Sequence, residues 1–173
     1  MAKIFDTDKG FKKLIKEVER IGRMEAKAGW VENSSKDTRR EAGITNAEVA
    51  LSVINGNLRT GQPPRDFLKN VENDKGAGYI RLLGEQVKTQ VRNYTPKNRK
   101  AFVQDYRKVL TKVAIQATSD IKLELKDNTG RYRENANSTI KTWQSKRRSN
   151  RNASKKLFVD TSQLINSITS VVK

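Results

Sequence analysis

The chain has 173 residues, a length that suits one domain, and it carries 36 lysine and arginine residues against 19 acids. The formal net charge of +17 favours an acidic partner, namely nucleic acid, an anionic membrane or an acidic protein surface, although charge that only maintains solubility is the alternative. The sequence has no cysteine and no histidine, which excludes disulfides, zinc–thiolate sites and histidine general bases. No pair of acids stands in a recognisable catalytic motif. We therefore expect a binding protein rather than an enzyme, with no metal and no cofactor.

The apolar content of 35% and the charged content of 32% predict a modest core and a heavily charged surface. The first ten residues lack the apolar run of a secretory signal, and no apolar run approaches the ~20 residues of a membrane span. We therefore expect a protein of the reducing cytoplasm with no membrane partner.

Apolar residues at helical spacing predict a first helix within residues 1–26, which Asp6, Thr7 or Asp8 caps and Gly22 ends. The apolar stripe of this helix is Phe11, Leu14, Ile15, Val18 and Ile21. We expect its opposite face to be solvated, with the cations Lys12, Lys13, Lys16 and Arg20. Residues 28–31 form a short apolar run that is a candidate strand.

A second helix is predicted from a capping box. Thr45 and Glu48 have the spacing of that motif, and Ile44 and Val49 occupy the two positions of a hydrophobic staple. Gly56 is expected to stop this helix.

Two prolines interrupt the chain after the second helix. Pro63 and Pro64 force an extended backbone there, so we expect residues 64–68 to be a strand and a third helix to open at Asn73 or Asp74. The apolar face of that helix is Tyr79, Leu82, Leu83, Val87 and Val91. The nearby acids Asp66, Glu72 and Asp74 are interpreted as solvated loop residues rather than a metal site.

The longest helix is predicted between residues 96 and 126, with Thr95 as its cap and Pro96 as its first residue. At 1.5 Å per residue this helix spans roughly 45 Å and is expected to be the spine of the fold. Asn128 and Gly130 would end it. Its continuous apolar stripe is Phe102, Tyr106, Val109, Leu110, Val113, Ala117, Ile121 and Leu125.

A basic polar region covers residues 127–156. Like charges repel at this density, so we interpret it as a loop that can order on an acidic partner. The cations of its second half, which includes no acid, are Lys141, Lys146, Arg147, Arg148, Arg151, Lys155 and Lys156.

The final segment, residues 157–173, is compact. Asp160 and Gln163 have capping-box spacing for a short helix, whose apolar face is Leu164, Ile165 and Ile168. Residues 169–172 are expected to form a strand.

Three patches of the sequence, in this order, resemble one family, and Gly29-Trp30-Val31 fits the strand that opens the family's core. The first patch is Ala47-Glu48-Val49-Ala50, then Gly56, then Pro63 to Leu68, which resembles an internal pattern. The second patch, Asn137 to Lys141, resembles the segment that precedes the family's closing signature, and the third, Phe158 to Ile168, resembles that signature itself. The family is that of the tailed-phage virion-morphogenesis proteins, which are tail-completion or head–tail joining proteins. Ser162 stands where that signature usually has glycine, and Ile54 and Asn55 stand where relatives have an acid and an aromatic residue.

The resemblance implies a structural role and no chemistry. It implies a ring of copies, a hexamer or dodecamer, in the neck of the virion, between the portal or adaptor and the tail terminator or tail proteins. Contact with packaged DNA would also fit, and assembly would begin in the host cytoplasm. The motif residues are Thr45, Glu48, Gly56, Phe67, Asp160, Thr161, Gln163, Leu164, Ser167 and Ile168. Candidate contacts with neighbours are Pro63, Pro64, Arg65, Lys146, Arg147, Arg148, Arg151, Lys155 and Lys156.

The predicted architecture is a single α+β domain over residues 1–173, mostly helical. It comprises an N-terminal helix (1–26), a core (27–126), a basic polar region (127–156) and a C-terminal helix and strand (157–173). A small antiparallel sheet would use segments near 28–31, 64–68 and 169–172, with the long helix packed across it. The alternative function is nucleic-acid binding through the basic surface, although no helix-turn-helix, zinc module or RNA-binding aromatic motif is present.

Overall fold

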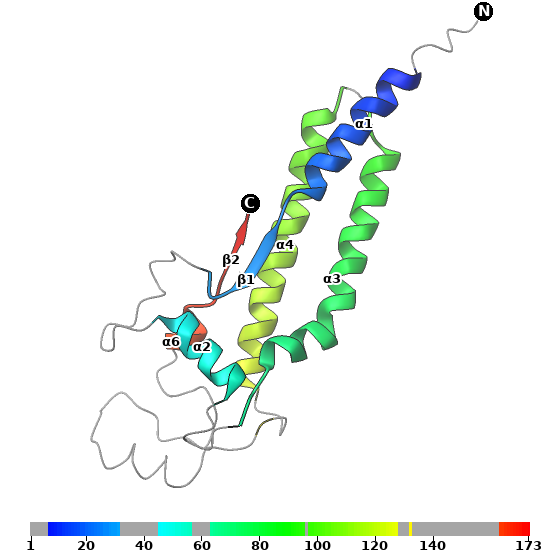
Figure 1. Cartoon of the computed structure of the whole chain (residues 1–173). Helices are drawn as coiled ribbons and strands as arrows, with labels where there is room; N and C mark the ends of the chain where they lie inside the picture. Colours follow the sequence, from blue (N-terminus) through cyan, green and yellow to red (C-terminus); the bar gives the residue numbers. More distant parts are fainter. Residues whose placement is uncertain (1–6, 32–44, 57–62, 96, 128–131, 133–162) are drawn as a thin grey trace, which may run out of the picture.

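A computed structural model of the chain describes residues 7–31, 45–56, 63–95, 97–127, 132 and 163–173 (Figure 1). The fold is α+β and mostly helical, which confirms the predicted class. In chain order the elements are α1 (Thr7–Gly22), β1 (Ala26–Gly29), α2 (Asn46–Asn55), α3 (Phe67–Arg92), α4 (Arg99–Lys126), α6 (Gln163–Asn166) and β2 (Thr169–Val172).

The long helix α4 is the spine of the molecule, as predicted. Its 28 residues span about 42 Å at 1.5 Å per residue. It contacts α3, α1 and both strands, and α3 runs back along it as an antiparallel hairpin (Figure 1). The apolar stripe of α4 therefore supplies the core along the length of the fold, with Phe102, Leu110, Ile121 and Leu125 buried.

The sheet has two strands among the described residues, where three were predicted. β1 pairs antiparallel with β2, with Ala26 opposite Val172 and Gly29 opposite Thr169. The prediction of a third strand at residues 64–68 is wrong, because α3 already begins at Phe67. The Asp66 carboxylate accepts a 3.0 Å hydrogen bond from the Lys69 backbone N–H and caps that helix, and the prolines before it lack the N–H groups of a ladder.

Two predicted helix starts are also corrected. The start at Asn73 or Asp74 is too late, so Glu72 and Asp74 are exposed helical residues rather than loop residues. The start at Thr95-Pro96 is too early, because Asn98 organises the turn before α4. Its side chain accepts from the Thr95 N–H at 2.8 Å and donates to the Asn93 carbonyl at 2.9 Å.

Helix α2 matches its sequence signature. Both hydrogen bonds of the capping box are present: Glu48 N–H donates to Thr45 Oγ1 at 3.1 Å, and Thr45 N–H donates to Glu48 Oε2 at 2.7 Å. Gly56 follows the helix with φ +70°, a left-handed value that glycine adopts without strain. The partner of Val49 in the predicted staple, Ile44, lies outside the described residues, as do the predicted helix terminators Asn128 and Gly130.

Replacing Thr45 with alanine is expected to lower the free energy of unfolding by about 1 kcal/mol, because the Glu48 N–H loses its acceptor. Thr111→Ala, on the exposed surface of α4, is the matched control and is expected to have little effect. Urea denaturation followed by circular dichroism measures both. Equal stability of the two variants would contradict the role of the cap.

The same cap predicts a pH dependence. Hydrogen bonds from the Thr45 backbone and hydroxyl hold the pKa of Glu48 below its usual 4.5. A carboxylate with a lowered folded-state pKa stabilises the fold above its unfolded pKa, and this stabilisation is lost as pH falls through the lower folded value. Glu48→Gln is therefore expected to destabilise the protein at neutral pH and to match wild type in strong acid.

Candidate partner interface

Two of the sequence patches that carry the family resemblance, the internal pattern and the closing signature, meet in one core cluster, whereas residues 137–141 lie outside the described residues. Ala50 from α2, Phe67 from α3 and Leu164, Ile165 and Ile168 from the C-terminal segment are all buried together with the end of α4. Up to 118 residues of sequence separate these side chains, from Ala50 to Ile168. The cluster lies at the end of the α3–α4 hairpin where α2 and α6 also lie (Figure 1).

Trp30, from the segment that fits the opening strand, contacts the closing signature. Its indole N–H lies 3.0 Å from both the Leu164 carbonyl and Ser167 Oγ, so both can accept from it. Its ring meets the edge of Phe67 with centroids 5.6 Å apart. Ser167 is 2% exposed and donates its own hydroxyl to the Leu164 carbonyl at 2.9 Å. The serine of the closing signature is therefore a buried structural residue rather than an exposed contact.

The proline turn is fixed to the end of α2. The Arg65 N–H lies 3.2 Å from the carbonyls of both Val53 and Ile54 and donates into that helix end. Pro64 is exposed, whereas Pro63 and Arg65 are half-buried. Burial lowers the pKa of the Arg65 guanidinium from its ordinary value. Of the three candidate contact residues of this turn, Pro64 is the one that the fold presents most openly.

The basic candidates lie outside the part of the chain that the structure describes. This applies to the cations of residues 141–156 and to the signature residues Asp160 and Thr161. Gln163, Leu164 and Ile168 are described, and the predicted helix and strand that follow Asp160 are confirmed as α6 and β2. The assignment of the basic segment to a partner contact therefore stays a prediction.

A buried carboxylate attaches α1 to the body of the protein. Glu17 is 1% exposed and pairs with the guanidinium of Arg99, the first residue of α4. Arg20, one turn further along α1, approaches the same carboxylate at 4.0 Å. Glu17 Oε2 has no hydrogen-bond partner among the described residues. The attraction between opposite charges, rather than a complete set of hydrogen bonds, therefore attaches α1 at this point.

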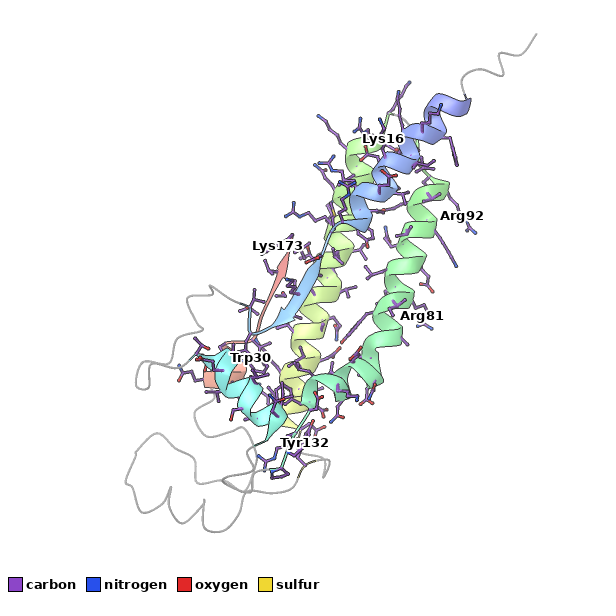
Figure 2. The ribbon with its side chains drawn as sticks, viewed as in Figure 1. Lys16, Trp30, Arg81, Arg92, Tyr132 and Lys173 are labelled. Carbon is purple, nitrogen blue, oxygen red and sulfur yellow. The ribbon has the colours of Figure 1, made fainter. Side chains whose placement is uncertain are left out.

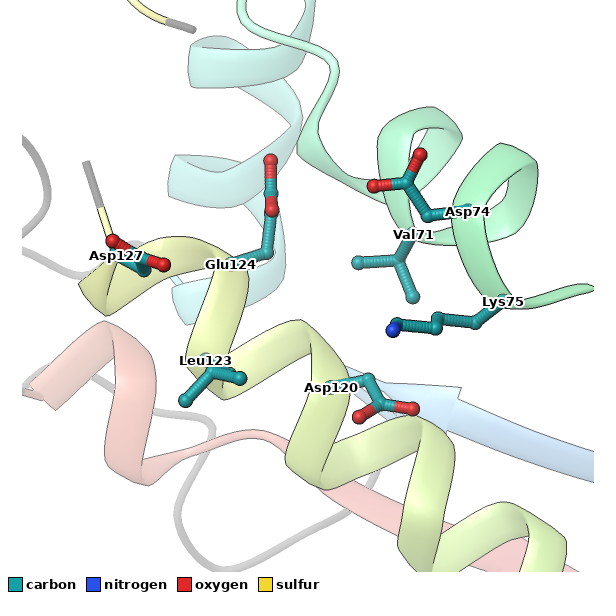
Figure 3. Close-up of a pocket in the computed structure, with 7 residues that line it drawn as sticks. All are labelled: Val71, Asp74, Lys75, Asp120, Leu123, Glu124 and Asp127. Atoms are coloured by element: carbon teal, nitrogen blue, oxygen red, sulfur yellow. The ribbon is translucent and has the colours of Figure 1, made fainter. Parts of the chain in front are cut away.

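An acidic hollow lies between the start of α3 and the end of α4, at the end of the hairpin that also holds the core cluster and opposite the Glu17–Arg99 pair. Its volume is about 60 Å³, and Figure 3 shows its lining residues, which are Val71, Asp74, Lys75, Asp120, Leu123, Glu124 and Asp127. The Tyr79 hydroxyl donates to Asp120 at 2.5 Å, and burial together with this carboxylate raises the pKa of the Tyr79 phenol. Asn70 and Tyr132 both donate to Glu124, at 3.3 and 2.6 Å.

Sequence reasoning missed both the Glu17–Arg99 pair and the acidic hollow. Glu17 could have been noticed, because it lies three residues after Leu14 and four before Ile21 on the buried side of a helix. The hollow had no local signal, since its two walls are 45 or more residues apart in sequence and meet only through the hairpin.

Within the described residues, no group of three or more acids is placed to hold a metal ion. Likewise, none of the helices in that part of the chain is long and apolar enough to cross a membrane. Comparison with known proteins finds no matching family model, no matching curated protein and no matching solved structure.

Proposed function

We propose that this chain is a structural binding protein without catalytic activity. More particularly, we propose that it is a neck or tail-completion protein of a tailed phage, which joins the head connector to the tail as a ring of copies. The observation that carries the proposal is the core cluster, because two patches that resemble one family in sequence, the internal pattern and the closing signature, also pack on one another in space. A chance likeness of separate patches would not require Trp30, Phe67 and Leu164 to be in mutual contact.

The proposed mechanism is assembly by contact. The α3–α4 hairpin would present the exposed Pro64 turn, which precedes α3, to neighbouring copies around a ring. Ring interfaces are heterologous, so each copy uses two different patches. Basic residues of the segment 141–156 would then pair with acidic neighbours or with the phosphates of packaged DNA.

Interrupting the gene in the virus is expected to yield DNA-filled heads and separate tails, counted by electron microscopy. Supplying the wild-type chain from a plasmid should restore joined particles. Supplying a chain with glutamine at the seven basic positions from Lys141 to Lys156 should not, although its circular dichroism spectrum should match wild type. Complete, infectious particles in the absence of the chain would contradict the proposal.

Nucleic-acid binding is the second candidate, and the cationic face of α1 favours it. Lys12, Lys13, Lys16 and Arg20 are all exposed on one helix, and Lys16 and Arg92 lie at the same end of the molecule (Figure 2). If the chain contacts about seven phosphates of duplex DNA, a plot of the logarithm of the binding constant against the logarithm of the salt concentration should have a slope of about −6. Fluorescence anisotropy with labelled duplex measures it. A flat response to salt would remove this candidate.

A further inference from the structure

Helix α1 carries more apolar surface than the fold covers. Ile21 is 3% exposed, and Leu14 is half-buried against the body of the protein. In contrast Phe11, Ile15 and Val18 are 61%, 42% and 38% exposed. Their spacing of four and three residues places them on one stripe of the helix, the α1 stripe, beside the buried face. Single exposed apolar residues are normal, but a row of three on one helix face marks a contact surface.

The residues that border the α1 stripe define the chemistry of its partner. At 100° per residue, Lys12, Lys16 and Glu19 lie along its outer edge, and Lys13 and Arg20 lie just beyond them. A partner that covers this stripe therefore offers apolar side chains surrounded by negative charge. Such a surface is unusual on a chain whose net charge is +17.

The acidic hollow has this composition. Leu123 is 63% exposed at the hollow, and Val71 lies in its wall. Four carboxylates line it, from Asp74, Asp120, Glu124 and Asp127, against the single cation Lys75. In Figure 3 Val71, Asp74 and Lys75 come from the start of α3, and Asp120, Leu123, Glu124 and Asp127 come from the end of α4.

The two surfaces lie at opposite ends of the molecule. Glu17 fixes α1 to Arg99 at the start of α4, whereas the hollow uses the last two turns of α4 (Figure 1). One copy therefore cannot cover its own stripe with its own hollow. We propose that the α1 stripe of one copy docks on the acidic hollow of a second copy. This contact is heterologous, so its repetition closes into a ring or continues as a filament. This contact would supply the subunit interface of the ring proposed above. The docking itself can be tested without the virus, and only its biological role rests on the proposed function.

Sedimentation velocity of the purified full-length chain tests the docking. Wild type is expected to associate in a concentration-dependent way, and more weakly in high salt, because part of the contact is between charges. Ile15→Glu places a carboxylate opposite the acidic hollow, and Leu123→Lys places a cation opposite α1. Each is expected to weaken association by about 30-fold or more, the effect of losing a central contact residue. Leu82→Glu, at an exposed position in the middle of α3, is the matched control and should associate like wild type.

A mixture of the two variants gives the sharpest result. The Ile15→Glu chain keeps an intact hollow and the Leu123→Lys chain keeps an intact α1 stripe, so an equimolar mixture is expected to form heterodimers and nothing larger. A symmetric contact between two α1 helices would give no such heterodimer and would overturn the proposal.

Two other outcomes would also overturn it. One is a wild-type chain that stays monomeric up to about 1 mM, a concentration that would reveal even a millimolar dissociation constant. The other is a monomer whose α1 stripe binds anionic lipid vesicles instead, with binding lost in Ile15→Glu. Because these measurements use the chain without virus, their failure would leave the neck assignment to be judged on virus particles.

Discussion

Phe67→Ala is expected to lower the free energy of unfolding by about 3–5 kcal/mol, which is a large part of the stability of a small domain. Phe67 is 0% exposed and lies at the centre of the core cluster, between α2, α4 and the C-terminal segment. Its removal leaves a cavity and takes away the edge contact with Trp30. Chemical denaturation monitored by circular dichroism and Trp fluorescence measures the change.

Leu82→Ala is the control for Phe67→Ala, since Leu82 is 50% exposed on α3 and should cost far less. The cost of the Phe67 change should also depend on Trp30. In a double-mutant cycle with Trp30→Ala, the two changes are expected to couple by about 0.5–1.5 kcal/mol, the range measured for aromatic pairs. A Phe67→Ala protein as stable as wild type would show that the patches do not share one core.

Arg99→Met is expected to destabilise the fold more than Glu17→Leu does. Removing Arg99 leaves the carboxylate of Glu17, whose side chain is 2% exposed, without its main counter-charge. Breaking a buried pair in this way typically costs about 3–5 kcal/mol. The Arg99 side chain is 54% exposed and Arg20 lies 4.0 Å from the same carboxylate, so we expect at most about 3 kcal/mol here.

The buried pair is tested by comparing how much Arg99→Met and Glu17→Leu each destabilise the fold. Glu17→Leu removes the buried charge and leaves an exposed arginine, which water solvates, so its cost should be small. The double variant Glu17→Leu/Arg99→Met should therefore regain most of the stability that Arg99→Met loses. If Glu17→Leu proved the more damaging single change, the buried carboxylate would be making a contact beyond its two arginines.

Where a short stretch of sequence contains its own hydrogen-bond partners, it predicts the structure well. Thr45 and Glu48 cap α2 with each other, and the apolar residues of the C-terminal segment lead directly into α6 and β2. The apolar stripe from Phe102 to Leu125 keeps helical spacing over so many residues that it predicts a single long helix. The fold class and the packing of α4 on the sheet follow from these local signals.

The predicted element boundaries were wrong where two local sequence signals competed. The prolines at 63 and 64 suggested a strand, but Asp66 and the helix-forming run after it produced α3 at once. Thr95 before a proline suggested a helix cap, but Asn98 closed the turn instead. Contacts across the fold, such as Glu17 with Arg99 or α3 with the end of α4, join residues more than 40 positions apart and have no counterpart in local sequence.

The apolar face of α1 shows a different limit. The pattern correctly indicated an amphipathic helix over Thr7–Gly22, but it did not indicate how much of the apolar arc the protein itself would cover. The buried side holds Ile21 and Glu17, and the stripe of Phe11, Ile15 and Val18 stays exposed. Periodicity predicts that a face will be covered, and only the structure shows whether the cover lies within the chain.

The most direct test of the neck assignment is quantitative mass spectrometry of density-purified virus particles. We expect the chain to be present at a low, fixed copy number, about six or twelve per portal, as a closed ring requires. Copy numbers in the hundreds would place the chain in the shell or the tail tube instead. Its absence from purified particles would contradict the assignment and leave the basic surface, and therefore nucleic-acid binding, as the leading explanation.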